Sequence, residues 1–224
     1  MAQKHVVKMD HVARPIPAYR HVMTTSATPG QRIYLAGASG VIGLRLVPLL
    51  VEAGHTVGAM TRSAEKADRL ASLGAEPIVC DVFDRAALMD AVRSFSPDLV
   101  LHELTDLPDA AADLPNARLL NARIRVEGTR NLIDAMANSG PTKIVAQSIA
   151  WASEPGPPAD AVTSLEDAVL AANGVVLRYG AFYGPGTYYD GELPADPRVH
   201  IDTAAVRTVE ALDAPSGILT IVDE

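Results

Sequence analysis

The clearest chemical pattern in the sequence is a set of three glycines, Gly37, Gly40 and Gly43, in the stretch IYLAGASGVIG. They lie between a short apolar run typical of a β-strand and a helical pattern. In such a turn the first glycine permits a tight bend, the second lets backbone amides approach a diphosphate, and the third allows close packing of helix on strand. The amino end of the helix adds partial positive charge. Dinucleotide binding is therefore expected, with a glycine cluster needed only for packing as the alternative. The predicted diphosphate-binding residues are Gly37, Ala38, Ser39, Gly40, Val41, Ile42 and Gly43.

The end of the second predicted strand selects between the two nicotinamide dinucleotides. An acidic residue there binds both ribose hydroxyls of NAD(H), whereas an arginine accommodates the 2′-phosphate of NADP(H). The segment GAMTRSAEK has Arg62 at this point, Ser63 beside it, and no acid before Glu65. NADP(H) is therefore favoured over NAD(H), with Arg62 on the phosphate. The alternative is that Arg62 is an exposed residue without a function.

The end of the third predicted strand carries two candidates for binding the adenine ring, Asp81 and Val82. Asp81 can accept a hydrogen bond from the adenine amino group, with Val82 against the ring. Alternatively, Asp81 caps the helix that begins near Asp84. We interpret the neighbouring Cys80 as a buried strand residue and not as a nucleophile. As the only cysteine in the chain, it excludes an intramolecular disulfide and a multi-cysteine metal site.

The elements that must position these residues alternate along the chain from Arg32 onward. Strands alternating with helices predict a parallel sheet covered on both faces, a Rossmann-like doubly wound α/β domain whose ligands bind beyond the carboxyl ends of the strands. Pro48, inside the first helix, should remove a backbone hydrogen bond or kink the helix. The predicted strands are Ile33–Gly37, His55–Met60, 76–82, Asp98–Leu104, 143–148 and Gly174–Gly180, with a last strand at 217–222. The predicted helices are 42–53, 63–74, 84–95, Asn116–Ser139, 153–170 and Thr203–Leu212.

Composition sets the limits on class and partners. A hydrophobic content of 48% with 4% aromatic residues predicts an aliphatic core, and a net charge of −8 argues against nucleic acid as a partner. No apolar run approaches the length of a membrane span, and the first residues are too polar for a signal peptide, so we expect a cytoplasmic protein without membrane contact. Residues 1–30 are predicted to be a flexible or surface-docked extension of a single domain, 31–224. The extension holds three histidines whose spacing fits no compact ligand motif, and no metal site is expected.

Several ordered motifs resemble the extended and atypical short-chain dehydrogenase/reductases, specifically the NAD-dependent epimerase/dehydratase group. The resemblance covers roughly Gln31 to Glu224. It implies a Rossmann-like fold, a nicotinamide cofactor, a small-molecule substrate, and a homodimer formed through the helices that flank the fourth and fifth strands. The matching pieces are GASGVIG, CDVFD, VLHELTDL, NARIRVEGTRNLIDA, VAQSIAWA, VVLRYGAFYGPG and HIDTAAVRTVEAL.

The resemblance also exposes two departures. In that family a Ser or Thr at the end of the fifth strand orients the substrate, and a Tyr-x-x-x-Lys pair on the next helix transfers a proton. Ser148 matches the serine, but Pro158 stands at the tyrosine position and Val162 at the lysine position. The second departure is a reduced C-terminal substrate region, 181–224. The substrate side is therefore expected to be open, or completed by a partner subunit.

Four residues are the candidates for the missing acid–base chemistry. His102 and Glu103 lie at the end of the fourth predicted strand, where the nicotinamide should lie, and histidine titrates near neutral pH. Leu104, next to them, is predicted to bind the cofactor. The alternative is that His102 and Glu103 only form a wall of the cofactor site through backbone contacts. Tyr183 can donate a proton, whereas tyrosines in such a loop more often line an apolar pocket. Ser148 can still hydrogen-bond a substrate oxygen.

Three functions are compatible with this pattern. We favour an NAD(P)-dependent oxidoreductase or epimerase-like enzyme that acts on a small polar metabolite with a non-standard proton donor. The second function is a non-redox dehydratase, cyclase or isomerase, and the third is a non-catalytic NADP(H) sensor. Loss of the Tyr/Lys pair is the feature that supports the two alternatives.

Overall fold

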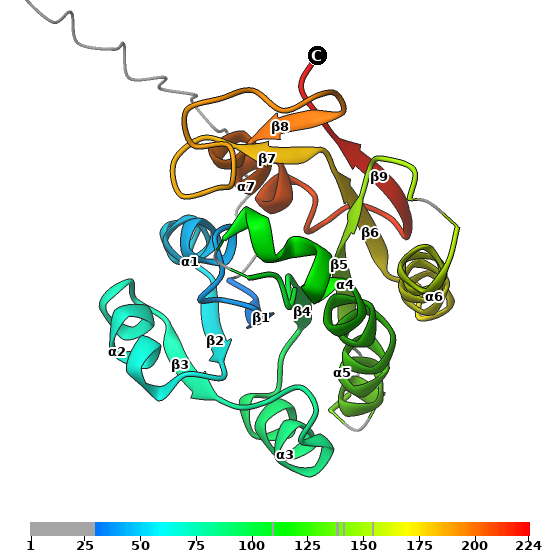
Figure 1. Ribbon diagram of the computed structural model, residues 1–224. Helices are drawn as coiled ribbons and strands as arrows, with labels where there is room; N and C mark the ends of the chain where they lie inside the picture. Colours follow the sequence, from blue (N-terminus) through cyan, green and yellow to red (C-terminus); the bar gives the residue numbers. More distant parts are fainter. Residues whose placement is uncertain (1–29, 109, 138, 141, 154) are drawn as a thin grey trace, which may run out of the picture.

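The computed structural model describes residues 30–108, 110–137, 139–140, 142–153 and 155–224 (Figure 1). The predicted N-terminal extension lies outside the described residues, except for Gly30. Within the described stretches, no helix is both long and apolar enough to cross a membrane.

A seven-stranded parallel sheet forms the centre of the molecule, in the order β3-β2-β1-β4-β5-β6-β9. The order reverses between β1 and β4, and in such sheets the crevice at this reversal binds the ligand. The prediction of a Rossmann-like doubly wound fold is confirmed. The strands are β1 (Arg32–Ala36), β2 (Thr56–Thr61), β3 (Glu76–Val79), β4 (Leu99–His102), β5 (Lys143–Ile149), β6 (Val175–Tyr179) and β9 (Gly217–Ile221).

Helices cover both faces of the sheet (Figure 1). On one face α1, α2 and α7 bury an aliphatic core that includes Leu46, Leu50 and Leu70. On the other face α3, α5 and α6 bury a second core that includes Val92, Leu132 and Leu165. The helices are α1 (Gly43–Glu52), α2 (Ala64–Ser72), α3 (Arg85–Phe95), α4 (Leu114–Arg123), α5 (Thr129–Ala137), α6 (Pro157–Ala171) and α7 (Ile201–Glu210), with a 3₁₀ turn η1 (Ala111–Asp113) before α4.

The long helix predicted at Asn116–Ser139 is interrupted. A π-helical turn, η2 (Ile124–Gly128), joins α4 to α5. Such a turn accommodates one extra residue and therefore shifts the face that the following residues present; π-turns inside helices are often found at functional sites. The other predicted irregularity is mild, since α1 continues past Pro48.

A second, two-stranded parallel sheet was not predicted. It pairs β7 (Ala181–Tyr183) with β8 (Arg198–His200) above the carboxyl end of β6. The backbones approach closely where the chain leaves β6, because a Cβ on Gly180 would lie 2.6 Å from the Arg198 carbonyl carbon. The small sheet holds the loop 184–197 near the amino end of α1 (Figure 1).

Candidate cofactor and active site

The glycine turn is closed on its protein side and open to solvent. Gly37 has φ of 95°, and a Cβ there would lie 2.6 Å from the Glu103 carbonyl oxygen; a Cβ on Gly43 would lie 2.3 Å from the Gly37 oxygen. Gly40 is exposed, and its added Cβ would meet only the Gly37 oxygen, at 3.3 Å. Ala38 and Ile42 are buried, so they can contribute only backbone groups. This arrangement fits a diphosphate that approaches at Gly40, in front of the first amides of α1.

The rim of the crevice beyond β2 carries the predicted arginine. Arg62 is half-exposed and forms an ion pair of 3.0 Å with Asp106, in the loop after β4. The backbone amide of Asp106 in turn donates to Asn121 on α4. Within the turn, the Ser39 hydroxyl lies 3.0 Å from the hydroxyl of Thr61. Arg62 is therefore in reach of a ligand at the end of β2, but its guanidinium is already occupied by a carboxylate.

The predicted adenine corner contains one exposed and one buried residue. Asp81 is exposed and accepts from the Phe83 amide at 2.9 Å, while Asp84 caps α3 by accepting from the Ala87 amide. The alternative that Asp81 caps this helix is wrong. Val82 is 1% exposed, packs beside Gly128, and leaves little of its side chain for a ring. Cys80 is buried, and burial raises the pKa of its thiol to about 11, so it stays protonated.

His102 does not face the sheet edge as an acid or base would. It is 1% exposed, its Nε2 lies 2.9 Å from the Thr129 hydroxyl, and its Nδ1 accepts from the Leu104 amide at 3.3 Å. Burial, with a smaller effect of the Arg125 charge, lowers the pKa of His102 to about 4, so the ring is neutral at physiological pH. The neutral ring then donates from Nε2 to Thr129 and fastens α5 to the end of β4. Leu104 is half-buried beside it.

Glu103 points to the opposite face of the sheet, into a chain of hydrogen bonds. Its Oε1 lies 3.2 Å from the Tyr179 hydroxyl, which lies 2.6 Å from the Thr208 hydroxyl, and Thr208 donates to the Ala204 carbonyl at 2.7 Å. The Tyr179 hydroxyl is the donor to Glu103. Burial raises the pKa of Glu103 to about 8, against the hydrogen bond from Tyr179, which lowers this pKa. The other carboxyl oxygen of Glu103, Oε2, has no partner among the described residues.

Ser148 is buried under α6 and does not face the open edge. It is 1% exposed, and its hydroxyl donates to Glu166 at 2.6 Å. Arg178 donates to both oxygens of Glu166, at 2.9 and 2.5 Å. Burial opposes the ionisation of Glu166, but the hydrogen bonds from Arg178 and Ser148 outweigh it and hold the pKa of this carboxyl below its usual range. The Ser148 hydrogen is therefore used inside the protein.

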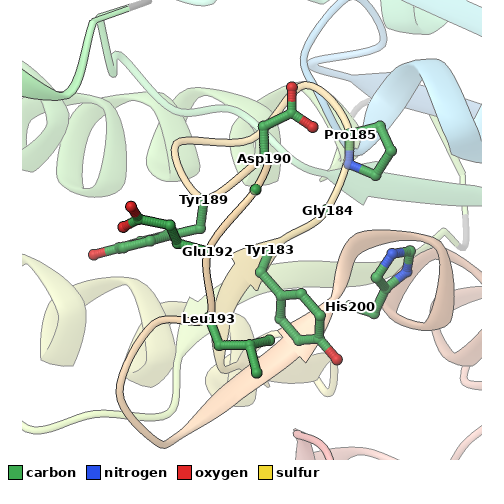
Figure 2. Close-up of a pocket in the computed structure, with 9 residues that line it drawn as sticks. Tyr183, Gly184, Pro185, Tyr189, Asp190, Glu192, Leu193 and His200 are labelled. Carbon is green, nitrogen blue, oxygen red and sulfur yellow. The ribbon is translucent and has the colours of Figure 1, made fainter.

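Tyr183 lines a pocket of about 310 Å³ that the loop after β7 encloses (Figure 2). Its hydroxyl donates to Asp223 at 2.8 Å, and this hydrogen bond raises the pKa of Tyr183. Its ring meets the edge of His200, with centroids 5.2 Å apart. His200 directly precedes α7 and caps it through Nδ1, which accepts from the Asp202 amide. Figure 2 shows Tyr183 and His200 on one side of the loop, with Tyr189 on the other.

The same loop reaches the cofactor turn. Arg45, on α1, donates to the Pro185 carbonyl at 2.5 Å, and a Cβ on Gly186 would lie 3.9 Å from Val41. The Tyr188 hydroxyl donates to the Pro108 carbonyl, beyond β4. The loop therefore borders the crevice between β1 and β4 on the substrate side.

Comparison with known proteins decides the family. Residues 37–178 match a family model described as NAD(P)H-binding. A 3-diazoavenalumate denitrifying reductase from Streptomyces is 35% identical, over an alignment that covers 86% of this chain and 76% of the relative. The chain belongs to the NAD(P)H-binding family of short-chain dehydrogenase/reductase-like proteins. It is an NAD(P)-dependent enzyme of the oxidoreductase/epimerase type.

The other similarities are more distant. A quinoline-oxide ketoreductase from Stigmatella aurantiaca is 33% identical over 107 residues, 46% of this chain and 29% of the relative. Among solved structures, UDP-glucose 4-epimerase from Thermus thermophilus with NAD has a TM-score of 0.70 at 20% identity, covering 85% of this chain and 77% of that one. Bordetella bronchiseptica WbmG with NAD has a TM-score of 0.68 at 19% identity, covering 86% and 73%. These likenesses establish the shared fold.

The sequence did not indicate the charged cluster of Arg125, Glu166 and Arg178. One signal for Glu166 was present in the sequence. Pro158, Val162 and Glu166 are spaced by four residues on α6, so Glu166 lies on the helix face where the resemblance leads one to expect the tyrosine and lysine. Arg125 and Arg178 gave no such signal, because isolated arginines in helices and strand ends are usually solvated.

Proposed function

We propose that this enzyme is an NADP(H)-dependent reductase that acts on an acceptor needing no proton from the protein. One observation carries the proposal: the sequence has no tyrosine or lysine between Ser148 and Tyr179, and Ser148 gives its hydrogen to Glu166. His102 is neutral, buried and bonded on both ring nitrogens. A carbonyl acceptor would require a proton at its oxygen, and neither Ser148 nor His102 is placed to give one.

The acceptor class follows from the relative that acts on a diazo compound. Bound NADPH would supply the hydride. An aryl diazonium ion needs only that hydride: one C–H bond forms at the ring carbon, the C–N bond breaks, and neutral N₂ leaves with its electron pair. Charge balances without a proton, since a cation and a hydride give a neutral arene. A site that has lost its Tyr/Lys pair is therefore sufficient for this reaction.

The residues around the turn support NADP(H) as the cofactor. Gly37, Gly40 and Gly43 leave room for a diphosphate only at Gly40. Arg62 is the cation at the end of β2 that would take the 2′-phosphate, after releasing Asp106. Asp81, exposed beyond β3, remains the candidate for the adenine amino group.

A deuterium experiment tests the proposal. The protein is incubated with 3-diazoniumcinnamate and NADPH deuterated at the transferred position of C4, and NADPH absorbance, N₂ and cinnamate are measured. We expect stoichiometric N₂ and deuterium on ring carbon 3, at a rate well above that without protein or with Gly40→Val. Transfer of solvent deuterium from D₂O to the ring, or rapid reduction of ketones in place of the diazonium ion, contradicts the proposal.

The missing pair also favours the non-redox and sensor functions, and the same assay separates them. A dehydratase, cyclase or isomerase would convert its substrate without net loss of NADPH. A sensor would bind NADPH without turnover of any acceptor.

We propose in addition that the enzyme is a homodimer that pairs through α4, α5 and α6. Leu119 and Leu120 on α4 are 67% and 53% exposed, which is unfavourable on a free surface. Light scattering should give the dimer mass for the wild type and the monomer mass for the double variant Leu119→Glu, Leu120→Glu. A wild-type monomer at micromolar concentration contradicts this proposal.

A further inference from the structure

Arg125 is an unusual arginine in this chain. It lies in the π-helical turn η2 and is half-buried. Arg123, the last residue of α4, is exposed and paired with Glu127. Within the described part of the chain, every other arginine that is partly buried has a hydrogen bond or ion pair, and Arg125 has neither. The partnered arginines are Arg32, Arg45, Arg178, Arg198 and Arg207.

Its neighbours along the helix fix where Arg125 lies. One turn before it, Asn121 accepts from the Asp106 amide in the loop after β4. One turn after it, Thr129 bonds His102 at the end of β4. Arg125 therefore lies alongside the segment between His102 and Asp106, at the carboxyl edge of the sheet, where ligands of doubly wound folds bind. The turn also packs against α6, the helix that carries Pro158 and Val162.

The charge of Arg125 is not neutralised by its surroundings. Glu166 is the carboxylate that acts on it, but both oxygens of Glu166 are already bonded to Arg178, and Ser148 adds a third bond. With His102 neutral, the cluster of two arginines and one glutamate keeps one positive charge. Arg125 is half-buried, and this burial lowers the pKa of its guanidinium. A guanidinium stays protonated in proteins, so a half-buried cation without a partner favours an anionic ligand.

We infer that Arg125 binds the carboxylate of an organic-acid substrate at the carboxyl edge of β4 and β5. A guanidinium presents two parallel N–H donors that match one carboxylate. The cofactor diphosphate does not need Arg125, because it is expected to bind at the glycine turn on the other side of the crevice. This inference rests on the proposed reductase function, because it names the substrate class of the same site. It makes Arg125 a specificity-determining residue, in the region where the family's lysine is replaced by Val162.

The test compares an acid with its ester in the cofactor complex. Binding of 3-aminocinnamate and of its methyl ester to the protein–NADP⁺ complex is measured by calorimetry, for the wild type, Arg125→Met, Arg125→Lys and the control Arg130→Met. Arg130 lies five positions along the same helix and is exposed, so its replacement removes a charge without touching the edge. We expect the wild type and Arg130→Met to prefer the acid by roughly tenfold or more, as for a charged hydrogen bond. Arg125→Met should lose this preference, Arg125→Lys should keep part of it, and NADP⁺ affinity should be unchanged throughout.

Equal binding of acid and ester to the wild type overturns the inference, and so does an unchanged preference in Arg125→Met. The wild-type comparison decides the matter even if Arg125→Met does not fold. The two proposals can fail separately. Acid preference without diazonium reduction overturns the proposed function alone, whereas diazonium reduction without acid preference overturns this inference alone.

Discussion

The Ser148 hydroxyl donates a 2.6 Å hydrogen bond to Glu166, one helical turn beyond Val162 on α6. This hydrogen bond gives the serine a structural partner in a stretch where no tyrosine or lysine occurs before Tyr179. Ser148 adds a further hydrogen bond to the buried carboxylate of Glu166, which already forms an ion pair with Arg178. Its expected role is therefore to stabilise the packing of α6 on β5.

Ser148→Ala should lower stability more than activity. The buried Glu166 would lose one hydrogen bond, which costs about 1–3 kcal/mol in the free energy of unfolding. We expect kcat with the diazonium acceptor to change less than about threefold, because Ser148 makes no contact with the reacting atoms in the transition state. Urea unfolding and NADPH oxidation measure the two quantities, with the exposed Ser72→Ala as the control. A large loss of kcat at unchanged stability would place Ser148 on the substrate instead.

Glu103→Gln should remove a pH dependence of stability. The folded-state pKa of Glu103 is about 8, above the ordinary 4.5, so the folded state binds this proton more tightly than the unfolded state. Its contribution is therefore fully present below about pH 4.5 and is lost as pH rises through 8. At about 1.4 kcal/mol per pKa unit the loss is at most about 5 kcal/mol. A glutamine keeps a carbonyl acceptor for the Tyr179 hydroxyl and does not titrate.

Urea unfolding between pH 4 and 9 tests this expectation. The free energies of unfolding of wild type and Glu103→Gln should converge near pH 4 and separate toward pH 9, with the variant more stable. Parallel curves would mean that burial does not raise the pKa of Glu103 in the folded protein.

The pair Arg62–Asp106 should tune the choice of cofactor. If Arg62 must leave Asp106 to bind the 2′-phosphate, Asp106→Asn frees the guanidinium and lowers the Kd for NADPH. The gain is at most about fivefold, because an exposed ion pair is worth up to about 1 kcal/mol. Arg62→Ala should raise that Kd by roughly tenfold or more, the effect of losing a charged hydrogen bond. Fluorescence titration with NADH is the internal control, since its Kd should stay constant in both variants. Equal changes for NADH and NADPH would remove Arg62 from the phosphate site.

The sequence predicted the sheet and the glycine turn because both depend on local patterns. Alternation of apolar strands with helices and the spacing of Gly37, Gly40 and Gly43 are visible without tertiary contacts. The orientation of side chains at the strand ends is not visible in this way. His102 and Glu103 are neighbours at the edge of β4, yet they point to opposite faces and are both buried, because successive strand residues alternate and helices cover both faces.

The charged cluster around Arg125 and Glu166 was hard to predict from the sequence for a different reason. The sequence around Arg125 is consistent with one continuous solvated helix. It does not show the π-helical turn that interrupts the helical period there. Whether an arginine has a partner depends on side chains far away in the chain, such as Glu166. The small sheet of β7 and β8 was not predicted for a related reason, because strands of three residues show too little periodicity in the sequence.

Gly40 and Gly43 should respond to substitution in opposite ways, which tests the cofactor turn. A Cβ on Gly43 would lie 2.3 Å from the Gly37 oxygen and 2.7 Å from Ala38, so Gly43→Ala forces the backbone apart and should lower the melting temperature strongly. A side chain on Gly40 meets only one atom, at 3.3 Å, and otherwise projects toward solvent, where the diphosphate is expected. Gly40→Val should therefore fold with nearly wild-type circular dichroism and melting temperature but lose calorimetric heat with NADPH and NADH alike. If Gly40→Val binds either nucleotide with wild-type affinity, the diphosphate does not lie at this turn. The roles proposed for Arg62 and Arg125 would then lose their support, because both assume a cofactor bound there.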